Sequence, residues 1–185
     1  MKSLKEFSEE KSIVKPLYVF VPRAPEVFDD LFKKISESGL SVIRRSEGFS
    51  EDLQPNASID WNNIDVLLGD SFGEMYFYLK LCDNVVAGGG FWHTGAHNII
   101  EQLQLHKPVT VGPEIWTIKF PAHQAEEAGL LTVVKDPSEL TSNLRLMLES
   151  NVNDRFSRDK FAKFLKIYAG ASNRALAMLE NKGLI

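Results

Sequence analysis

The chain has 185 residues, of which 44% are hydrophobic and 25% are charged, and its formal net charge is −4. These values predict one globular domain with a substantial core and exclude a disordered chain. The acidic balance gives no global attraction to nucleic acid, so we expect no nucleic-acid partner. Cys82 is the only cysteine, which excludes an intrachain disulfide and a cysteine metal cluster.

Short apolar runs alternate with helical patterns along the chain. The apolar runs predict strands at 17–21, 41–45, 64–69, 84–88, 108–112 and 130–134. The helical patterns predict helices near 25–38, 73–82, 97–106, 120–128, 137–149 and 154–181, the last interrupted at 169–172. Gly39 and Gly129 are placed to end two of these helices, and 48–63 reads as an exposed loop. This alternation predicts an α/β fold, a parallel sheet with helices on both faces.

We expect residues 1–185 to form a single domain, with a helical segment at 1–15 and a helical tail at 151–185. No apolar run approaches the roughly 20 residues of a membrane span, and the Lys/Glu-rich start does not resemble a secretory signal. A cytoplasmic location is therefore expected.

Polar and glycine residues follow three of the predicted strands, where ligands of open α/β sheets bind. Arg23 follows the first strand. The stretch "GDSFGEMYFYL" (69–79) and the stretch "VVAGGGFWHTGAHNIIEQLQL" (85–105) follow two others. An arginine fork and backbone amides at glycine-bearing helix starts match a phosphate, and a carboxylate can accept two ribose hydroxyls. Together the three corners predict a nucleotide site.

Each corner also has a purely structural interpretation. Asn98 with Glu101, and Ser71 with Glu74, fit ordinary helix-capping boxes, and Arg23 fits a surface ion pair. His93 and His97 lie four residues apart but lack a third ligand at a familiar spacing, so we predict no metal and no cofactor. Neither a G-x-G-x-x-G fingerprint nor a P-loop is present.

The C-terminal tail carries an apolar stripe within "RDKFAKFLKIYAG" (158–170), with lysines beside it. Its members are Phe161, Phe164, Leu165 and Tyr168. Such a stripe suits an anionic membrane surface or packing, and we favour packing. If the stripe packs on a separate partner domain, we expect it to be exposed in this chain.

Several motifs, in the same order along the chain, resemble the C-terminal domain of 3-deoxy-D-manno-octulosonic acid (Kdo) transferases. They are "VPRAPEVFDDL" (21–31), "GLSVIRRSEG" (39–48), "VLLGDSFGEMYFYLKLCD" (66–83) and "VVAGGGFWHTGAHNIIEQLQLHKPVTVGP" (85–113). The resemblance runs from about residue 16 to 149, and "ASNRALAMLE" (171–180) resembles the family's final helix. It implies the Rossmann-like C-terminal half of a GT-B glycosyltransferase, which binds the CMP-Kdo donor.

The resemblance also implies which residues contact CMP. The family's CMP-contacting segments fall on Pro22, Arg23, Gly73, Glu74, Met75, Asn98, Ile99, Ile100 and Glu101. These are the three corners already found at the strand ends. We expect Glu101 to accept from the ribose hydroxyls, Asn98 to orient the sugar-phosphate, and Arg23 with the Gly73 corner to hold the cytidine monophosphate portion.

For the family, the resemblance implies transfer of Kdo to the lipid A precursor in lipopolysaccharide biosynthesis, at the cytoplasmic face of the inner membrane. The expected ligand is CMP-Kdo or CMP. Nothing in the sequence corresponds to the family's N-terminal acceptor domain or to its catalytic glutamate, so we expect no catalytic residue here. The lipid A precursor would be reached only through a separate N-terminal half.

The family's first C-domain strand also has no counterpart, because residues 1–15 resemble a remnant of the helix that follows it. In a doubly wound sheet that strand is central, so its absence predicts either two half-sheets with unpaired ladders or a new edge arrangement. Two alternatives to a donor-binding transferase part stay open. One is a non-catalytic nucleotide-binding remnant, and the other is a different GT-B-type sugar-nucleotide enzyme.

Overall fold

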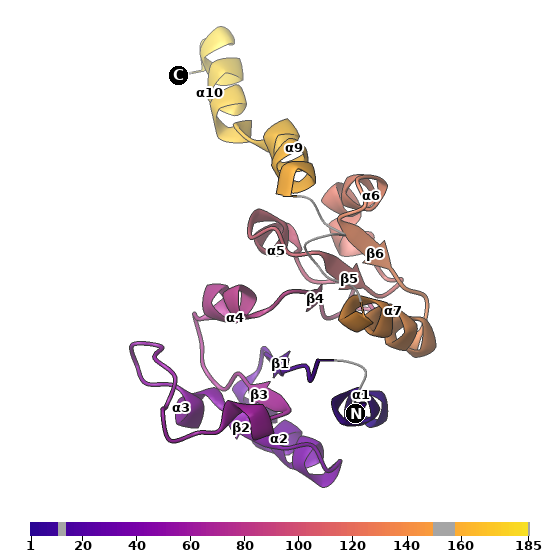
Figure 1. Cartoon of the computed structure of the whole chain (residues 1–185). Coiled ribbons are helices and arrows are strands. Elements are labelled where there is room, and N and C mark those ends of the chain that lie inside the picture. The colour runs from indigo at the N-terminus through magenta and orange to yellow at the C-terminus, as the bar shows by residue number, and fades with distance from the viewer. Residues whose placement is uncertain (11–13, 150–157, 185) are drawn as a thin grey trace.

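The protein is described by a computed structural model that covers residues 1–10, 14–149 and 158–184. Its six strands are all parallel and form two separate three-stranded sheets, in the orders β1-β3-β2 and β4-β5-β6. The strands are β1 (Tyr18–Phe20), β2 (Val42–Arg44), β3 (Val66–Leu68), β4 (Val85–Val86), β5 (Val109–Val111) and β6 (Leu131–Val133). All six lie inside the predicted ranges, so the α/β fold is confirmed (Figure 1).

Helices connect the strands, and most lie where the sequence predicts them. The α-helices are α1 (Lys2–Glu9), α2 (Phe28–Glu37), α3 (Arg45–Gly48), α4 (Met75–Leu81), α5 (Ile100–Gln104), α6 (Lys119–Glu127), α7 (Pro137–Glu149), α9 (Arg158–Tyr168) and α10 (Ala171–Asn181). The 3-10 helices are η1 (Pro25–Val27), η2 (Trp61–Asn63) and η3 (Trp116–Ile118). Gly39 and Gly129 follow the C-caps of α2 and α6 with φ of +81° and +70°, as expected.

Two details differ from the sequence-based expectation. The stretch 48–63 is not a plain loop, because α3 ends at Gly48, Phe49 pairs with Pro55, and Asp60 caps η2 by accepting from the Asn62 N–H at 3.2 Å. Helix α5 begins at Ile100, three residues later than expected. The residues before it instead form the irregular corner described below.

The first sheet packs on α1 and α2. Ile35, Leu40 and Val66 form its buried centre, and partly buried Leu4 and Tyr18 pack against it. The Tyr18 hydroxyl donates to the Leu4 carbonyl at 3.1 Å and thereby fixes α1 beside the strand that follows it.

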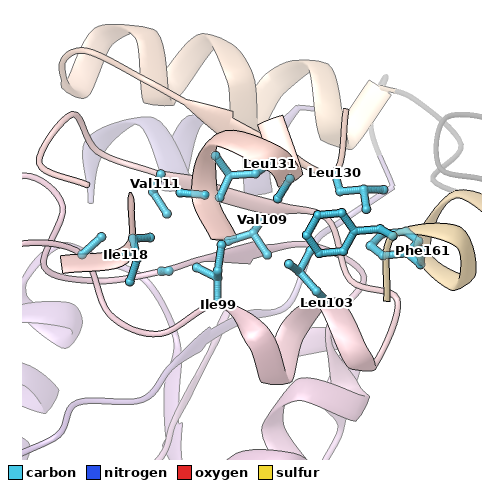
Figure 2. Close-up of a cluster of buried hydrophobic side chains, with 13 residues drawn as sticks. Ile99, Leu103, Val109, Val111, Ile118, Leu130, Leu131 and Phe161 are labelled. Atoms are coloured by element: carbon cyan, nitrogen blue, oxygen red, sulfur yellow. The ribbon is translucent and has the colours of Figure 1, made fainter. Parts of the chain in front are cut away.

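The second sheet is covered on both faces. The side chains of Val109 and Val111 face a core built with Ile99 and Leu103 and closed by Phe161 of α9 (Figure 2). The intervening Thr110 points to the opposite face, where its hydroxyl hydrogen-bonds Asn143 of α7 at 3.0 Å. Alternation along β5 therefore fixes which helices cover which face.

The two sheets have unpaired edges at β1 and β4. The Tyr18 N–H donates to the Asp65 carbonyl, and the Phe20 carbonyl accepts from the Gly69 N–H. Because hydrogen-bonding direction alternates along a strand, the N–H and C=O of Val19 point away from β3. Val85 and Ala87 donate to the carbonyls of Pro108 and Thr110 in the same way, so the peptide groups of Val86 point away from β5. Within the described ranges no ladder joins β1 to β4, and the expectation of two half-sheets is confirmed.

The two halves nevertheless touch through helices. Arg145 of α7 forms a bidentate ion pair with Glu10, at 2.9 and 3.2 Å, and its guanidinium lies 5.2 Å from the centre of the buried Phe7 ring. Helix α1 of the first half is thus held against α7 of the second.

The apolar stripe of the tail packs into the protein. Phe161 and Phe164 are buried in the core of the second half, and Leu165 is partly buried against it, so the packing interpretation is confirmed for these three; the Tyr168 side chain lies outside the described residues. Helix α10 extends away from both sheets and exposes Leu176 and Met178 (Figure 1). Among the described helices, none combines the length and apolar character that crossing a bilayer demands.

Candidate nucleotide-binding site

An open cavity of about 640 Å³ lies between the corner after β1 and the corner after β4. It is lined by Arg23, Thr94, Gly95, Ala96, His97, Asn98, Ile100, Thr117, Ile118, Phe120 and Pro121. Arg23 alone comes from the first half of the protein, and the other lining residues come from the second. The volume is within the range of about 300–1,000 Å³ that is typical of small-molecule sites.

The glycine-rich corner after β4 is closely packed. The His97 ring lies over Gly88, where an added Cβ would meet Nδ1 at 3.2 Å, and the His97 N–H donates to the Gly88 carbonyl at 2.9 Å. A Cβ on Gly89 would lie 2.2 Å from the Gly95 carbonyl oxygen, and one on Gly90 would lie 2.7 Å from a backbone nitrogen in the turn after β5. Because these three glycines have no side chains, the neighbouring turns and the His97 ring can pack closely against them. None of the three glycines lines the cavity.

The cavity wall carries positive and neutral polar groups. Its lining includes a guanidinium, an imidazole and a carboxamide, and none of the lining residues named above has a carboxylate. Burial, and secondarily the positive charge of Arg23, lower the pKa of His97. In a protein of net charge −4, this wall is suited to an anion.

The Asn98–Glu101 segment is divided between the cavity and the core. The Asn98 carboxamide oxygen accepts from the Ile100 N–H at 3.1 Å and so opens α5, while Ile99 is fully buried in the core. Glu101 is half-buried outside the cavity lining. In this fully described segment, the Asn98 oxygen accepts from the Ile100 N–H and not from the Glu101 N–H, and the Glu101 carboxylate accepts no hydrogen bond from the Asn98 N–H. Neither bond of the predicted capping box therefore forms.

The Gly73–Met75 corner belongs to the first half and does not line this cavity. Its carboxylate, Glu74, pairs with the buried Arg45 at 2.5 Å and accepts from the Ser71 hydroxyl. Ser71 in turn hydrogen-bonds Tyr78, whose pKa is raised chiefly by burial. Glu74 precedes α4 without capping it, so the Ser71–Glu74 contact is a polar network beside the sheet and no capping box forms.

The cavity brings together two of the three corners found in the sequence. Arg23, Asn98 and Ile100 line it, whereas Pro22, Gly73, Glu74, Met75, Ile99 and Glu101 do not. Sequence reasoning missed the wall formed by Thr117, Ile118, Phe120 and Pro121. The same strand-end rule, applied to the residues after β5, points to this segment but singles out none of its residues.

The sequence is similar to that of curated Kdo transferases. The 3-deoxy-D-manno-octulosonic acid transferase of Bordetella pertussis is 35% identical over 168 residues, which cover 90% of this chain and 37% of that protein. The Haemophilus influenzae enzyme of the same description is 30% identical over 171 residues, with 89% and 36% covered. The chain thus spans about a third of the length of these relatives. No protein-family model matches.

A solved structure has the same fold. The crystal structure of the C-terminal CMP-Kdo binding domain of WaaA from Acinetobacter baumannii matches with a TM-score of 0.72 at 22% sequence identity. The match covers 91% of this chain and 80% of that one. The arrangement of parallel strands and helices is therefore the Rossmann-like fold of that domain.

Proposed function

Because this chain belongs to the Kdo transferase family, as the counterpart of about a third of those proteins, we propose that it binds the CMP-Kdo donor of a glycosyltransferase. The observation that carries the proposal is the cavity itself. Its lining contains the Arg23 guanidinium and the Asn98 carboxamide, from two halves of the protein, and no carboxylate. A wall of this kind favours the phosphate of a nucleotide.

The proposed roles follow from the chemistry of each group. Arg23 binds the phosphate of CMP, and Asn98 holds the corner beside it through the Ile100 N–H. CMP is the leaving group of Kdo transfer, so a guanidinium at its phosphate stabilises charge that grows in the transition state. We further propose that Glu101 accepts from the ribose hydroxyls and that the Gly73–Met75 corner contacts the nucleotide when the donor is bound.

We attribute donor binding alone to these 185 residues. The acceptor, which in the family is the lipid A precursor, and the catalytic base are assigned to the part of the relatives that the match does not cover. Transfer then requires a separate acceptor-binding half and takes place peripherally at the cytoplasmic face of the inner membrane, in lipopolysaccharide biosynthesis.

The proposal is tested by calorimetric titration of the purified chain with CMP, UDP and GDP. We expect binding of CMP in preference to the other two nucleotides. Arg23→Ala should weaken CMP binding at least tenfold, because a charge-assisted bond contributes about 1.5–3 kcal/mol. Arg174→Ala removes the same charge from exposed α10 and serves as the matched control.

Each other outcome points to a named alternative. A folded chain that binds none of the three nucleotides contradicts donor binding and favours a remnant. Preference for UDP or GDP favours another GT-B-type sugar-nucleotide enzyme. If Glu101→Gln lowers stability and leaves CMP affinity unchanged, Glu101 has no part in the site.

A further inference from the structure

One wall of the cavity comes from a segment outside the nine residues assigned to CMP. It consists of Thr117 and Ile118 at the end of η3 and of Phe120 and Pro121 at the start of α6. The backbone of Phe120 is extended, with φ of −104° and ψ of 122°, so the helix is interrupted where this residue borders the cavity. The Phe120 side chain is 62% exposed.

This wall is fixed against the corner that carries Asn98. The Thr117 hydroxyl donates to the Ala96 carbonyl at 2.6 Å. Gly95, with φ of +83°, allows the close approach, because a Cβ there would lie 2.5 Å from the Thr117 methyl group. Ile118 and Pro121, on either side of Phe120, are buried. Phe120 is thus an exposed aromatic ring between two buried anchors.

The cavity lining has a phenyl ring and, separately, a cationic group. Phe120 contributes the only aromatic six-membered ring among the lining residues, and Arg23 contributes the guanidinium. A mononucleotide has matching parts, since its phosphate suits the guanidinium and its planar base suits the aromatic face. Bases stack on aromatic side chains with little dependence on base identity, at about 1–3 kcal/mol each. A sugar rich in hydroxyl groups finds no hydrogen-bonding atom on this side chain.

We propose that Phe120 is the residue on which the base of the bound nucleotide stacks, with Thr117 and Gly95 as positioning residues that hold it in place. This inference rests on the proposed function of the cavity. It adds a binding residue from the segment after β5 and assigns the two ends of the ligand, with the phosphate toward Arg23 and the base toward Phe120.

The test compares two probes, CMP and ribose 5-phosphate, by NMR titration, which measures affinities down to the millimolar range. Phe120→Ala should weaken CMP binding about tenfold to a hundredfold and leave ribose 5-phosphate binding unchanged, because that probe lacks a base. Phe120→Tyr should restore CMP binding. Trp92→Ala removes another exposed aromatic ring, one that does not line the cavity, and should change neither affinity.

Two results would contradict base stacking on Phe120, and a third would contradict the proposed function as well. Equal CMP affinity in Phe120→Ala and the unmodified chain excludes stacking while leaving nucleotide binding intact. If Phe120→Ala lowers the affinities for CMP and ribose 5-phosphate equally, the substitution disturbs the cavity wall as a whole and no contact with the base is involved. If the unmodified chain binds no CMP, the proposed function fails and this inference fails with it.

Discussion

Phe161→Ala tests whether the C-terminal tail is part of the core. The side chain is fully buried between α5 and β6, beside Leu103 and Leu130 (Figure 2), and its ring centre lies 5.5 Å from that of His106. Replacing a fully buried phenylalanine by alanine lowers the free energy of unfolding by about 3–5 kcal/mol, because apolar burial is lost and a cavity is left behind. Because domains of this size have about 5–15 kcal/mol of total stability, the loss is a large fraction.

Urea denaturation followed by circular dichroism measures this loss as a shift of the midpoint at constant slope. Ile167→Ala is the matched control, because Ile167 is on the same helix and 68% exposed, and we expect a change within about 0.5 kcal/mol. Binding to anionic lipid vesicles provides a second measurement. If Phe161→Ala costs less than about 1 kcal/mol and also abolishes vesicle binding, the stripe is a membrane contact and the packing interpretation is wrong.

Three further predictions concern the edges, the cavity and pH. In hydrogen exchange, the amides of Val19 and Val86 should exchange far faster than those of Leu67 and Thr110 in the central strands; equal protection would mean that the two inner edges are paired. Gly95→Ala should lower the free energy of unfolding by about 2 kcal/mol or more and abolish CMP binding, because its Cβ clashes with Thr117 in addition to straining the backbone. In Gly129→Ala, at φ +70°, the Cβ meets no atom within 4 Å, so only the backbone strain of about 1–2 kcal/mol should be lost from stability. Burial raises the pKa of Tyr18 from 10.0 to about 12. The contribution of the protonated Tyr18 to stability is therefore complete below pH 10 and is lost as the pH rises through about 12. Urea denaturation across this pH range should show this decrease in stability, and the decrease should be absent in Tyr18→Phe.

The strands could be predicted from the sequence because each lies in a short run of β-branched, aromatic or other apolar residues. Val66–Leu68 and Val109–Val111 are buried throughout, and both stand out as apolar runs between polar turns. The start of α5 was less predictable. The pattern from His97 onward looks helical, but the His97 N–H bonds back to the Gly88 carbonyl, and this tertiary contact delays the helix to Ile100.

The site was predictable only in part, for a related reason. Arg23 and Asn98 could be found because each follows a strand and carries a recognisable polar group. Phe120 could not, because an aromatic residue in "IKFPAHQ" (118–124) reads as an ordinary core residue of a helix. Pro121 accounts for the extended backbone of Phe120 and so for the break in α6. The exposure of the ring depends also on the burial of Pro121, which has no sequence signal of its own.

The position of the cavity relative to the two half-sheets has a consequence for binding. Arg23 follows β1 and Asn98 follows β4, the two strands whose inner edges are unpaired. Without a ladder between them, contacts such as the Arg145–Glu10 pair hold the halves together, and an ion pair that keeps about a third or more of its side-chain surface in solvent contributes little. A nucleotide that engages Arg23 and Asn98 at once adds a bridge between the halves at the carboxyl ends of these strands. Its affinity must include the cost of fixing the halves, so part of the interaction energy at Arg23 goes into ordering the protein.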